Sequence, residues 1–312
     1  MARRNIKKRI ANRNKEIFNS PIHSLHTDLH MHSTASDGRL APQDVLESAL
    51  VGGLDVISLT DHDVYPQLSF GLHHIEKTAK KTSLSKQNIF VIHGTEISVS
   101  YEDTEQHLLV YFPKQAPNSF REYCQDLCKR RAQRYDEIID WLRDKGCHKM
   151  EYSCEEAKKG RRALTRLHIA QELVHMNYVQ NTSEAFDLWL QHLEFPHSFP
   201  NIKEVLNDIK EMGGMTSWAH PKLKDAKRWL TIFANNGLQA VEVYRATNRK
   251  HFAKKQLISM AKAHNLHVTG GSDSHGTRPL GGFFIGLSNY HSWMKSMGLW
   301  DEIQSSFDNS VK

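Results

Sequence analysis

Short apolar runs that end in polar or charged residues recur along this chain, and helical-looking segments separate many of them. The runs cover residues 25–30, 56–60, 89–92, 108–112, 215–219, 240–244 and 267–270. Strands that alternate with helices are typical of a mostly parallel sheet, either open or closed into a barrel. A barrel places its chemistry at the C-terminal ends of its strands. The pattern therefore predicts an α/β protein with its functional residues at strand ends.

Length and apolar content narrow the class of protein. The chain has 312 residues, 39% of them hydrophobic, which is enough for one large barrel or two ordinary domains. No stretch approaches the roughly 20 consecutive apolar residues of a membrane helix, so we expect no membrane partner. The four cysteines lie within residues 124–154 without paired C-x-x-C spacing. This favours reduced thiols and a cytoplasmic location over a disulfide framework or a zinc ribbon.

The first residues of the chain are strongly basic. Seven lysines and arginines and no acid occur among the first fifteen residues, so the rest of the chain carries a formal charge of −1 rather than +6. Such an arm contacts nucleic-acid phosphates in some proteins and is a solvated tail in others. Both interpretations stay open.

Between residues 118 and 201 the strand pattern disappears and successive helices are predicted. Ser119 is a candidate cap for the first helix, Lys145-Gly146 a candidate stop, and Thr182-Ser183 a candidate start for a later helix. This segment reads as an inserted helical subdomain.

Two arginines, Arg131 and Arg134, fall on the apolar stripe of the first helix in that segment. An unpaired guanidinium is too costly to bury. The two side chains therefore reach the edge of the stripe, pair with carboxylates of the protein, or face an anionic ligand.

Histidine is the residue type that stands out, with 20 of the 312 residues. Imidazole is the commonest metal ligand and the usual proton-transfer group near neutral pH. His30 and His32, two apart on a predicted strand, project to the same side and can reach one ion, and Asp37 follows five residues later. An isolated pair of this kind is weak evidence, because most such pairs in a His-rich chain are incidental.

Carboxylates and imidazoles recur at the ends of the other predicted strands. They are Asp61, His62 and Asp63 after the run 56–59, Glu96 after the run 91–95, His107 before the run 108–112, His220 after the run 215–219, and Asp273 with His275 after the run 267–270. Each of these residues alone could lie in the core or in a turn with its hydrogen bonds made by the protein itself. Their joint recurrence at strand ends predicts a metal site.

The order and spacing of these motifs resemble the PHP (polymerase and histidinol phosphatase) domain family of metal-dependent phosphoesterases. The matching motifs are His30-x-His32-Ser-x-x-Ser36-Asp37-Gly38, Thr60-Asp61-His62-Asp63, Gly94-x-Glu96, His107, Ala219-His220-Pro221 and Gly271-Ser272-Asp273-x-His275. Within the family the resemblance is closest to a bacterial branch with 5'-to-3' exoribonuclease and 3',5'-nucleotide bisphosphate phosphatase activity. That likeness rests on Arg130-Arg131-Ala132-Gln133-Arg134 and Thr165-Arg166-x-His168.

The resemblance implies a distorted (β/α)7 barrel of the PHP type with an inserted helical cap. We accordingly expect a basic arm at 1–22, the metal-binding barrel at 23–117 and 202–290, the cap at 118–201, and a C-terminal helical tail at 291–312.

The resemblance also implies a site with two to three divalent ions, Mn²⁺ by preference, with Zn²⁺ or Fe²⁺ as alternatives that mixed ligation allows. The implied metal ligands are His30, His32, Asp37, His62, Glu96, His107, His220, Asp273 and His275. Glu96 is the expected bridging carboxylate. The implied catalytic residues are Asp37, His168 and His220, and the implied substrate-binding residues are Arg131, Arg134 and Arg166.

The expected activity is hydrolysis of phosphate esters by metal-activated water, on 5'-phosphorylated short RNA, on 3',5'-nucleotide bisphosphates, or on both. A small-metabolite phosphatase of the histidinol-phosphate type is the alternative within the family. A nucleic-acid-binding module with a purely structural metal cluster is the alternative of another class. No obligatory protein partner is expected.

Overall fold

The computed structural model describes residues 24–75, 88–150, 155–190, 193, 199–246 and 251–309. The expected basic arm at 1–22 lies outside these residues, and so does Cys154. The other three cysteines, Cys124, Cys128 and Cys147, are buried free thiols, as expected. Within the described residues no helix is long and apolar enough to cross a membrane.

Each of the seven predicted strands is present. They are β1 (His26–Met31), β2 (Val56–Leu59), β4 (Asn88–Val91), β6 (Thr104–Phe112), β7 (Met215–Trp218), β8 (Ala240–Arg245) and β9 (His267–Gly271). The sequence patterns missed β3 (Gly71–His74), β5 (His93–Tyr101) and the short β10 (Ile285–Gly286). Glu96 and His107 therefore lie inside strands β5 and β6 and not at strand ends.

The described strands form two five-stranded sheets, ordered β10-β1-β2-β4-β3 and β5-β6-β7-β8-β9. Parallel pairs run from β1 through β2 to β4 and from β7 through β8 to β9, whereas β5, β6 and β7 are antiparallel neighbours. The α/β class is confirmed, but the prediction of a mostly parallel sheet is wrong, because the β5–β6 hairpin reverses the chain inside the second sheet.

The two sheets meet where the predicted site residues lie. Isolated backbone bridges join His62 to Glu96 and Met31 to Ser274. These single bridges do not turn the described strands into one closed sheet, so a closed (β/α)7 barrel is not confirmed. They nevertheless bring the ends of β1, β2 and β9 against β5, which collects residues from distant parts of the sequence in one place.

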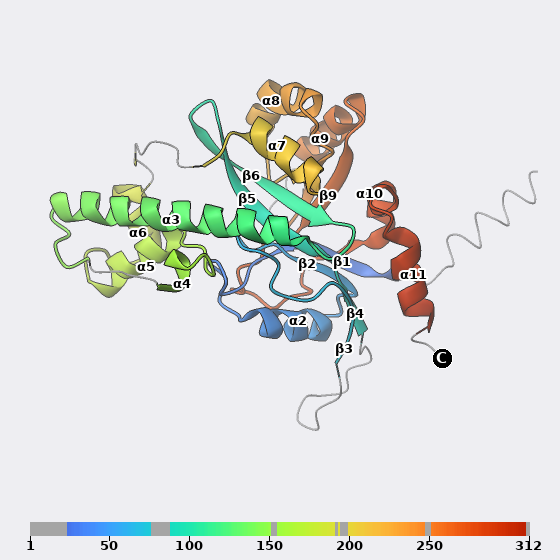
Figure 1. The fold of residues 1–312 in the computed structure, drawn as a ribbon, viewed down its shortest axis with the longest axis horizontal. Helices are drawn as coiled ribbons and strands as arrows, with labels where there is room; N and C mark the ends of the chain where they lie inside the picture. The colour runs from blue at the N-terminus through green and yellow to red at the C-terminus, as the bar shows by residue number, and fades with distance from the viewer. Residues whose placement is uncertain are drawn as a thin grey trace, which may run out of the picture.

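Helices cover the outer faces of the sheets (Figure 1). They are α2 (Pro42–Val51), α7 (Ile202–Glu211), α8 (Leu223–Asn235), α9 (His251–Ala263), α10 (His291–Ser296) and α11 (Trp300–Asn309). Helix α7 illustrates why they form: the Asn201 side chain accepts the Lys203 N–H at its start, and every buried residue lies on one face, at spacings of three and four. That face packs into the core cluster formed by β5 to β8.

The segment after β6 is helical, with α3 (Asn118–Asp144), α4 (Glu155–Lys158), α5 (Arg166–His175) and α6 (Thr182–Leu188). The far part of α3 and the three shorter helices share a separate hydrophobic cluster, and they form a lobe to one side of the sheets (Figure 1). Ser119 is not the cap of α3, because the helix starts one residue earlier after Pro117, without a side-chain cap. Helix α6 begins at Thr182 as predicted, capped by Asn181.

His93, at the start of β5, lies in the core and not in the predicted site. Its side chain is buried, and its Nδ1 accepts the backbone N–H of Ala116 at 3.0 Å. Burial lowers the pKa of His93 to about 4 and outweighs the opposing effect of the neighbouring Leu68 backbone. The folded protein thus keeps this ring neutral well below the pKa of about 6.5 that it has in an unfolded chain.

We predict that His93 makes the free energy of unfolding fall as the pH is lowered from about 6.5 to about 4. In this range the imidazole is protonated in the unfolded state but stays neutral in the folded state. The loss at the acid end is about 2–3 kcal/mol in the free energy of unfolding. His93→Gln, which keeps an acceptor but does not titrate, should flatten this part of the curve. Denaturant unfolding of both proteins between pH 8 and pH 4, with divalent ions chelated, measures the difference; parallel curves would contradict the prediction.

Candidate metal centre

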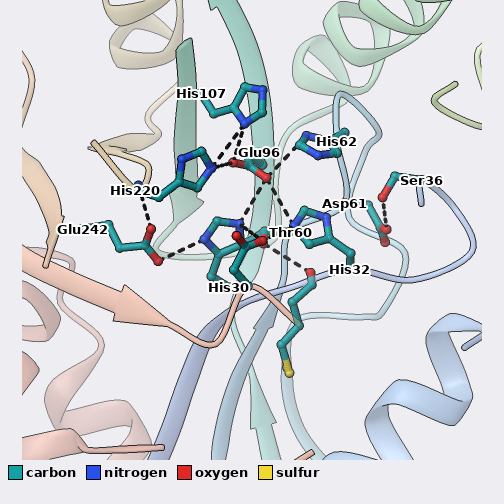
Figure 2. Close-up of polar contacts among 12 residues, drawn as sticks. His30, His32, Ser36, Thr60, Asp61, His62, Glu96, His107, His220 and Glu242 are labelled. Carbon is teal, nitrogen blue, oxygen red and sulfur yellow. Dashed lines mark hydrogen bonds and ion pairs between the residues drawn. The ribbon is translucent and has the colours of Figure 1, made fainter. Parts of the chain in front are cut away.

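A completely buried carboxylate, Glu96, lies at the centre of a group of imidazoles (Figure 2). Its Oε2 is within 3.4 Å of a ring nitrogen of His30, His32 and His62. Its Oε1 is 3.0 Å from His107 Nδ1 and 2.8 Å from His220 Nε2. The two oxygens therefore face two different sets of histidines, which is the arrangement that a bridging carboxylate needs.

Three overlapping groups of side chains could each hold a metal ion, with the ligand atoms of each group within 4.8 Å of one another. The groups are His32, Asp37, His62 and His275; His30, His32, Glu96 and Asp273; and His62, Glu96 and His107. They contain eight of the nine expected ligands. The ninth, His220, contacts Glu96 and lies 3.3 Å from His107. The structure thus brings all nine predicted side chains together.

Backbone conformation at two strand ends aims these ligands inward. His220 follows β7 with a φ of 31°, and Asp273 follows β9 with a φ of 55°, a left-handed region that non-glycine residues rarely adopt. Hydrogen bonds hold both turns: the N–H of His220 donates to Glu242 at 2.7 Å, and the N–H of Asp273 donates to the carbonyl of His30 at 2.8 Å.

Two carboxylates that sequence reasoning placed beside the ligands, Asp61 and Asp63, instead hold the surrounding loops. Asp61 accepts hydrogen bonds from the N–H and the hydroxyl of Ser33 and from the hydroxyl of Ser36, all at 2.6–2.7 Å. Asp63 accepts from the Ser98 N–H at 2.8 Å and pairs with Arg131. Asp61 thereby fixes the turn that carries Asp37, and Asp63 fixes the loop after His62.

Sequence reasoning missed Glu242 on β8. Its Oε1 is 3.0 Å from His30 Nδ1, on the opposite side of the ring from Glu96, and its other oxygen holds the His220 backbone. This is the outer carboxylate that orients many metal-ligating histidines. The signal in the sequence was weak, because Val-Glu-Val in an apolar strand is equally compatible with an exposed glutamate.

The electrostatics of the cluster favour added positive charge. Burial lowers the pKa of His32, but Asp273 and Glu96 outweigh it and raise the pKa to about 10. Burial raises the pKa of Asp37, yet His62 and His275 hold it well below its usual range. Carboxylates that draw protons onto imidazoles in this way draw a cation equally, and metal binding then releases those protons.

Open hydrogen-bonding capacity supports the same interpretation. Among the described residues, both ring nitrogens of the buried His32 and Nδ1 of the buried His62 make no hydrogen bond of good geometry, although Glu96 Oε2 lies within 3.4 Å of His32 Nε2 and His62 Nδ1. Buried polar atoms of this kind are rare and call for a specific explanation, such as an ion. A mixed set of imidazole and carboxylate donors suits Mn²⁺, Zn²⁺ or Fe²⁺. The residues therefore fit divalent metal ions.

A pocket of about 190 Å³ opens beside the cluster, between the sheets and the helical segment. Asp37, His62 and His107 line it on one side, and Arg131, Arg134 and Arg166 line it on the other. Of the alternatives open for Arg131 and Arg134, the structure shows pairing with carboxylates, Asp63 and Glu105 respectively. The small volume matches a phosphate better than a whole ligand molecule, which usually occupies at least roughly 300 Å³.

The three arginines differ in how free their donors are. Arg131 is buried, and it bonds to Asp63, Ser98 Oγ and the carbonyl of Leu164, so it ties α3 to the sheets and to the loop before α5. Arg134 and Arg166 instead share Glu105 at 3.4–3.5 Å, and Arg134 Nε has no partner among the described residues. Two guanidinium groups against one carboxylate leave a surplus positive charge in the pocket.

Glu105 is a second residue that sequence reasoning missed. It lies on β6 two residues before His107, and its Oε1 is 3.4 Å from His107 Nε2. Burial raises its pKa, but His107, Arg166 and Arg134 hold it well below the usual range, so the carboxylate stays ionised. Glu105 thus connects the metal ligands to the arginines.

His168 does not line this pocket. Its Nδ1 accepts the Thr165 N–H at 3.0 Å in a capping box at the start of α5, and Arg162 lies 3.1 Å from its Nε2. Burial and the neighbouring Arg162 lower its pKa to about 4. The Thr165-Arg166-x-His168 pattern is thus a helix start that presents Arg166, and the predicted catalytic role of His168 stays a prediction.

The sequence matches the PHP domain over residues 28–246. The chain belongs to the PHP domain family. As a PHP-family protein it is a metal-dependent phosphoesterase, a hydrolase of phosphate esters.

Two relatives of this chain are named for activities on RNA and on nucleotides. The chain is 27% identical over 256 residues to the 5'-3' exoribonuclease Rnm of Escherichia coli, which covers 80% of this chain and 84% of the relative. It is 25% identical over 256 residues to the 3',5'-nucleoside bisphosphate phosphatase of Chromobacterium violaceum, covering 80% of this chain and 86% of that enzyme.

Solved structures agree on the fold of this PHP protein. An amidohydrolase from Chromobacterium violaceum superposes with a TM-score of 0.67 at 21% identity, over 87% of this chain and 96% of that one. A protein from Bifidobacterium adolescentis gives a TM-score of 0.65 at 23% identity, over 86% and 95% of the two chains.

Gly271, at the end of β9, allows β9 to approach β1 at the site. A Cβ at this position would lie 2.4 Å from the backbone nitrogen of His30 and 2.3 Å from its Cβ. We predict that Gly271→Ala pushes β9 away from β1, lowers stability by about 1–3 kcal/mol and reduces metal content. Gly282→Ala is the control, because its Cβ would meet nothing closer than 3.6 Å. Equal melting temperatures for the two variants would contradict this packing argument.

Glu96→Gln keeps the shape of the central side chain and removes its charge. We predict that this variant binds divalent ions more than about tenfold more weakly, because the imidazoles then lack their shared counter-charge. Elemental analysis after dialysis against a metal buffer measures the ions retained per chain. Glu105→Gln is the matched control, since Glu105 touches His107 but belongs to none of the three donor groups. Full metal content in Glu96→Gln would show that Glu96 is not the shared ligand.

Proposed function

We propose that this PHP-family enzyme removes nucleotides from 5'-phosphorylated short RNA in the 5'-to-3' direction and also hydrolyses nucleoside 3',5'-bisphosphates. The observation that carries the proposal is the small pocket that Arg134 and Arg166 line together with Asp37, His62 and His107 of the metal-ligand cluster. A terminal phosphate held there places the next phosphate group of the substrate toward the cluster. The two relatives with these activities support the assignment.

One bond cleavage accounts for both activities. The oxygen of water bonds to the phosphorus on the 3' side of the first nucleotide, the P–O3' bond breaks, and its electron pair leaves with the 3'-oxygen, which takes up a proton. A bisphosphate then gives inorganic phosphate. An RNA gives a mononucleotide and a shortened strand that again carries a 5'-phosphate, so the next round can begin.

Divalent ions, when bound, lower the pKa of water and stabilise the negative charge that develops on phosphoryl oxygens. We assign two to three such ions to the nine ligands, with Mn²⁺ as the family resemblance implies. Glu96 would be shared between ions, and Glu242 orients His30 and the His220 backbone. Asp37 borders the arginine pocket and a second, larger pocket, so it lies where the reacting phosphate must sit. We propose that His220, like Asp37, is both a metal ligand and a catalytic residue.

The helical segment serves as a cap in this proposal. Arg131 anchors α3 to Asp63 and to the loop before α5, and the His168 capping box fixes the start of α5. These contacts position Arg134 and Arg166 without using their guanidinium groups. We therefore propose positioning roles for Arg131 and His168 and phosphate contacts for Arg134 and Arg166.

We predict that the wild-type enzyme prefers 5'-phosphorylated over 5'-hydroxyl oligoribonucleotides and that Arg134→Gln reduces kcat/KM for the phosphorylated substrate by about ten- to a hundredfold. Arg130→Gln is the matched control, because Arg130 lies on the exposed side of the same helix and pairs with Asp126. Product analysis should show mononucleotides released in steps. Phosphate release from histidinol phosphate with RNA left intact would identify a small-metabolite phosphatase instead.

A further inference from the structure

A second pocket borders the metal-ligand cluster and is much larger than the arginine pocket. It has a volume of about 710 Å³, against about 190 Å³, and it shares Asp37 and Leu167 with the smaller pocket. Asp273 and His275 also line it, so it opens onto the cluster itself. A volume in this range accommodates a ligand larger than a phosphate group.

The lining of this pocket suits a nucleotide chain. Arg39 and Arg278 supply two positive charges on exposed side chains, and Phe283 supplies an aromatic ring. The carboxylates of the lining are the buried Asp28, which accepts the backbone N–H of Ser272, and the expected metal ligands Asp37 and Asp273. Single-stranded nucleic acids are bound by this combination, because the cations follow the phosphates while aromatic rings stack on the bases.

A third pocket continues from the second one. It has a volume of about 290 Å³, and the two pockets share Phe283. Tyr244 and Lys254 line it, with the Lys254 ammonium 4.3 Å from the centre of the Tyr244 ring. Arg39, Arg278 and Phe283 thus line the pocket beside the cluster, and Tyr244 and Lys254 line the pocket that shares Phe283 with it.

We propose that the second and third pockets form a path for the RNA strand on the 3' side of the attacked phosphate. This proposal rests on the function proposed above and specifies the substrate class. In the bond cleavage described there, the attacked phosphorus stays attached to the downstream strand. A nucleoside 3',5'-bisphosphate has nothing downstream of that phosphorus, so it leaves the path empty. A path of this size and charge thus marks an oligonucleotide as the substrate for which the site is built.

The experiment compares kcat/KM for a nucleoside 3',5'-bisphosphate with kcat/KM for 5'-phosphorylated di-, tetra- and hexaribonucleotides. For the wild-type enzyme the value should rise with length. In Arg278→Gln and in Lys254→Gln, the ratio of the hexamer value to the bisphosphate value should fall about tenfold, because a charged contact to the downstream strand is lost. The salt dependence of hexamer hydrolysis should also become shallower, by about 0.7 in log–log slope for each contact removed.

Lys262→Gln is the matched control, since Lys262 lies on the same helix as Lys254, is exposed and lines none of the three pockets. Its ratio should equal that of the wild type. Rates that do not depend on length, or an equal fall for the hexamer and the bisphosphate in the Arg278 and Lys254 variants, would overturn the path. Failure to hydrolyse any of these nucleotides would overturn the proposed function itself, and the path with it. Thermal melting of each variant separates these results from a folding defect.

Discussion

The burial of one carboxylate governs the rest of this structure. Glu96 has no exposed surface, and an isolated charge in such a position would be too costly for a fold to retain. Its counter-charges come from five imidazoles. They belong to residues on β1 and β6 and just after β1, β2 and β7: His30, His107, His32, His62 and His220. Because imidazoles are neutral unless protonated, the arrangement is stable only when protons or metal ions supply positive charge. Cation binding and folding of the two sheets against each other are therefore coupled.

Further carboxylates around this cluster have two tasks: some orient the metal-ligand side chains, and others pair with arginines. Asp61 and Glu242 hold backbone groups and ring nitrogens, so the ligands meet the incoming ion already oriented. Asp63 and Glu105 face arginines of the helical segment. The same kind of side chain thus fixes the metal site from one side and the substrate pocket from the other.

Local sequence patterns predicted seven of the strands and the side chains that gather around Glu96, but not their arrangement. Apolar runs such as 56–60 are detectable because strand periodicity is local. Strand β5 was missed because Glu96 and Ser98 interrupt its apolar pattern with polar residues that lie at the site. Within Asp61-His62-Asp63, the pattern could not tell which residue ligates, because that depends on Ser33 and Arg131 from elsewhere in the chain. Likewise, the helical spacing of Arg134 predicted its direction but not its partner Glu105.

Under the proposed function, the position of the arginines would let one cluster serve both a small and a long substrate. Metal ligands alone would accept any phosphate ester that reaches them. The arginine pocket is too small for a nucleoside, so it selects the charge at the end of a substrate and leaves the remainder to lie along the larger pockets. The larger pockets that begin at Asp37 then limit the length of the substrate, and the chemistry at the cluster does not. In this proposal the arginines and the residues of the larger pockets determine selectivity, while the side chains gathered around the buried Glu96 support the reaction.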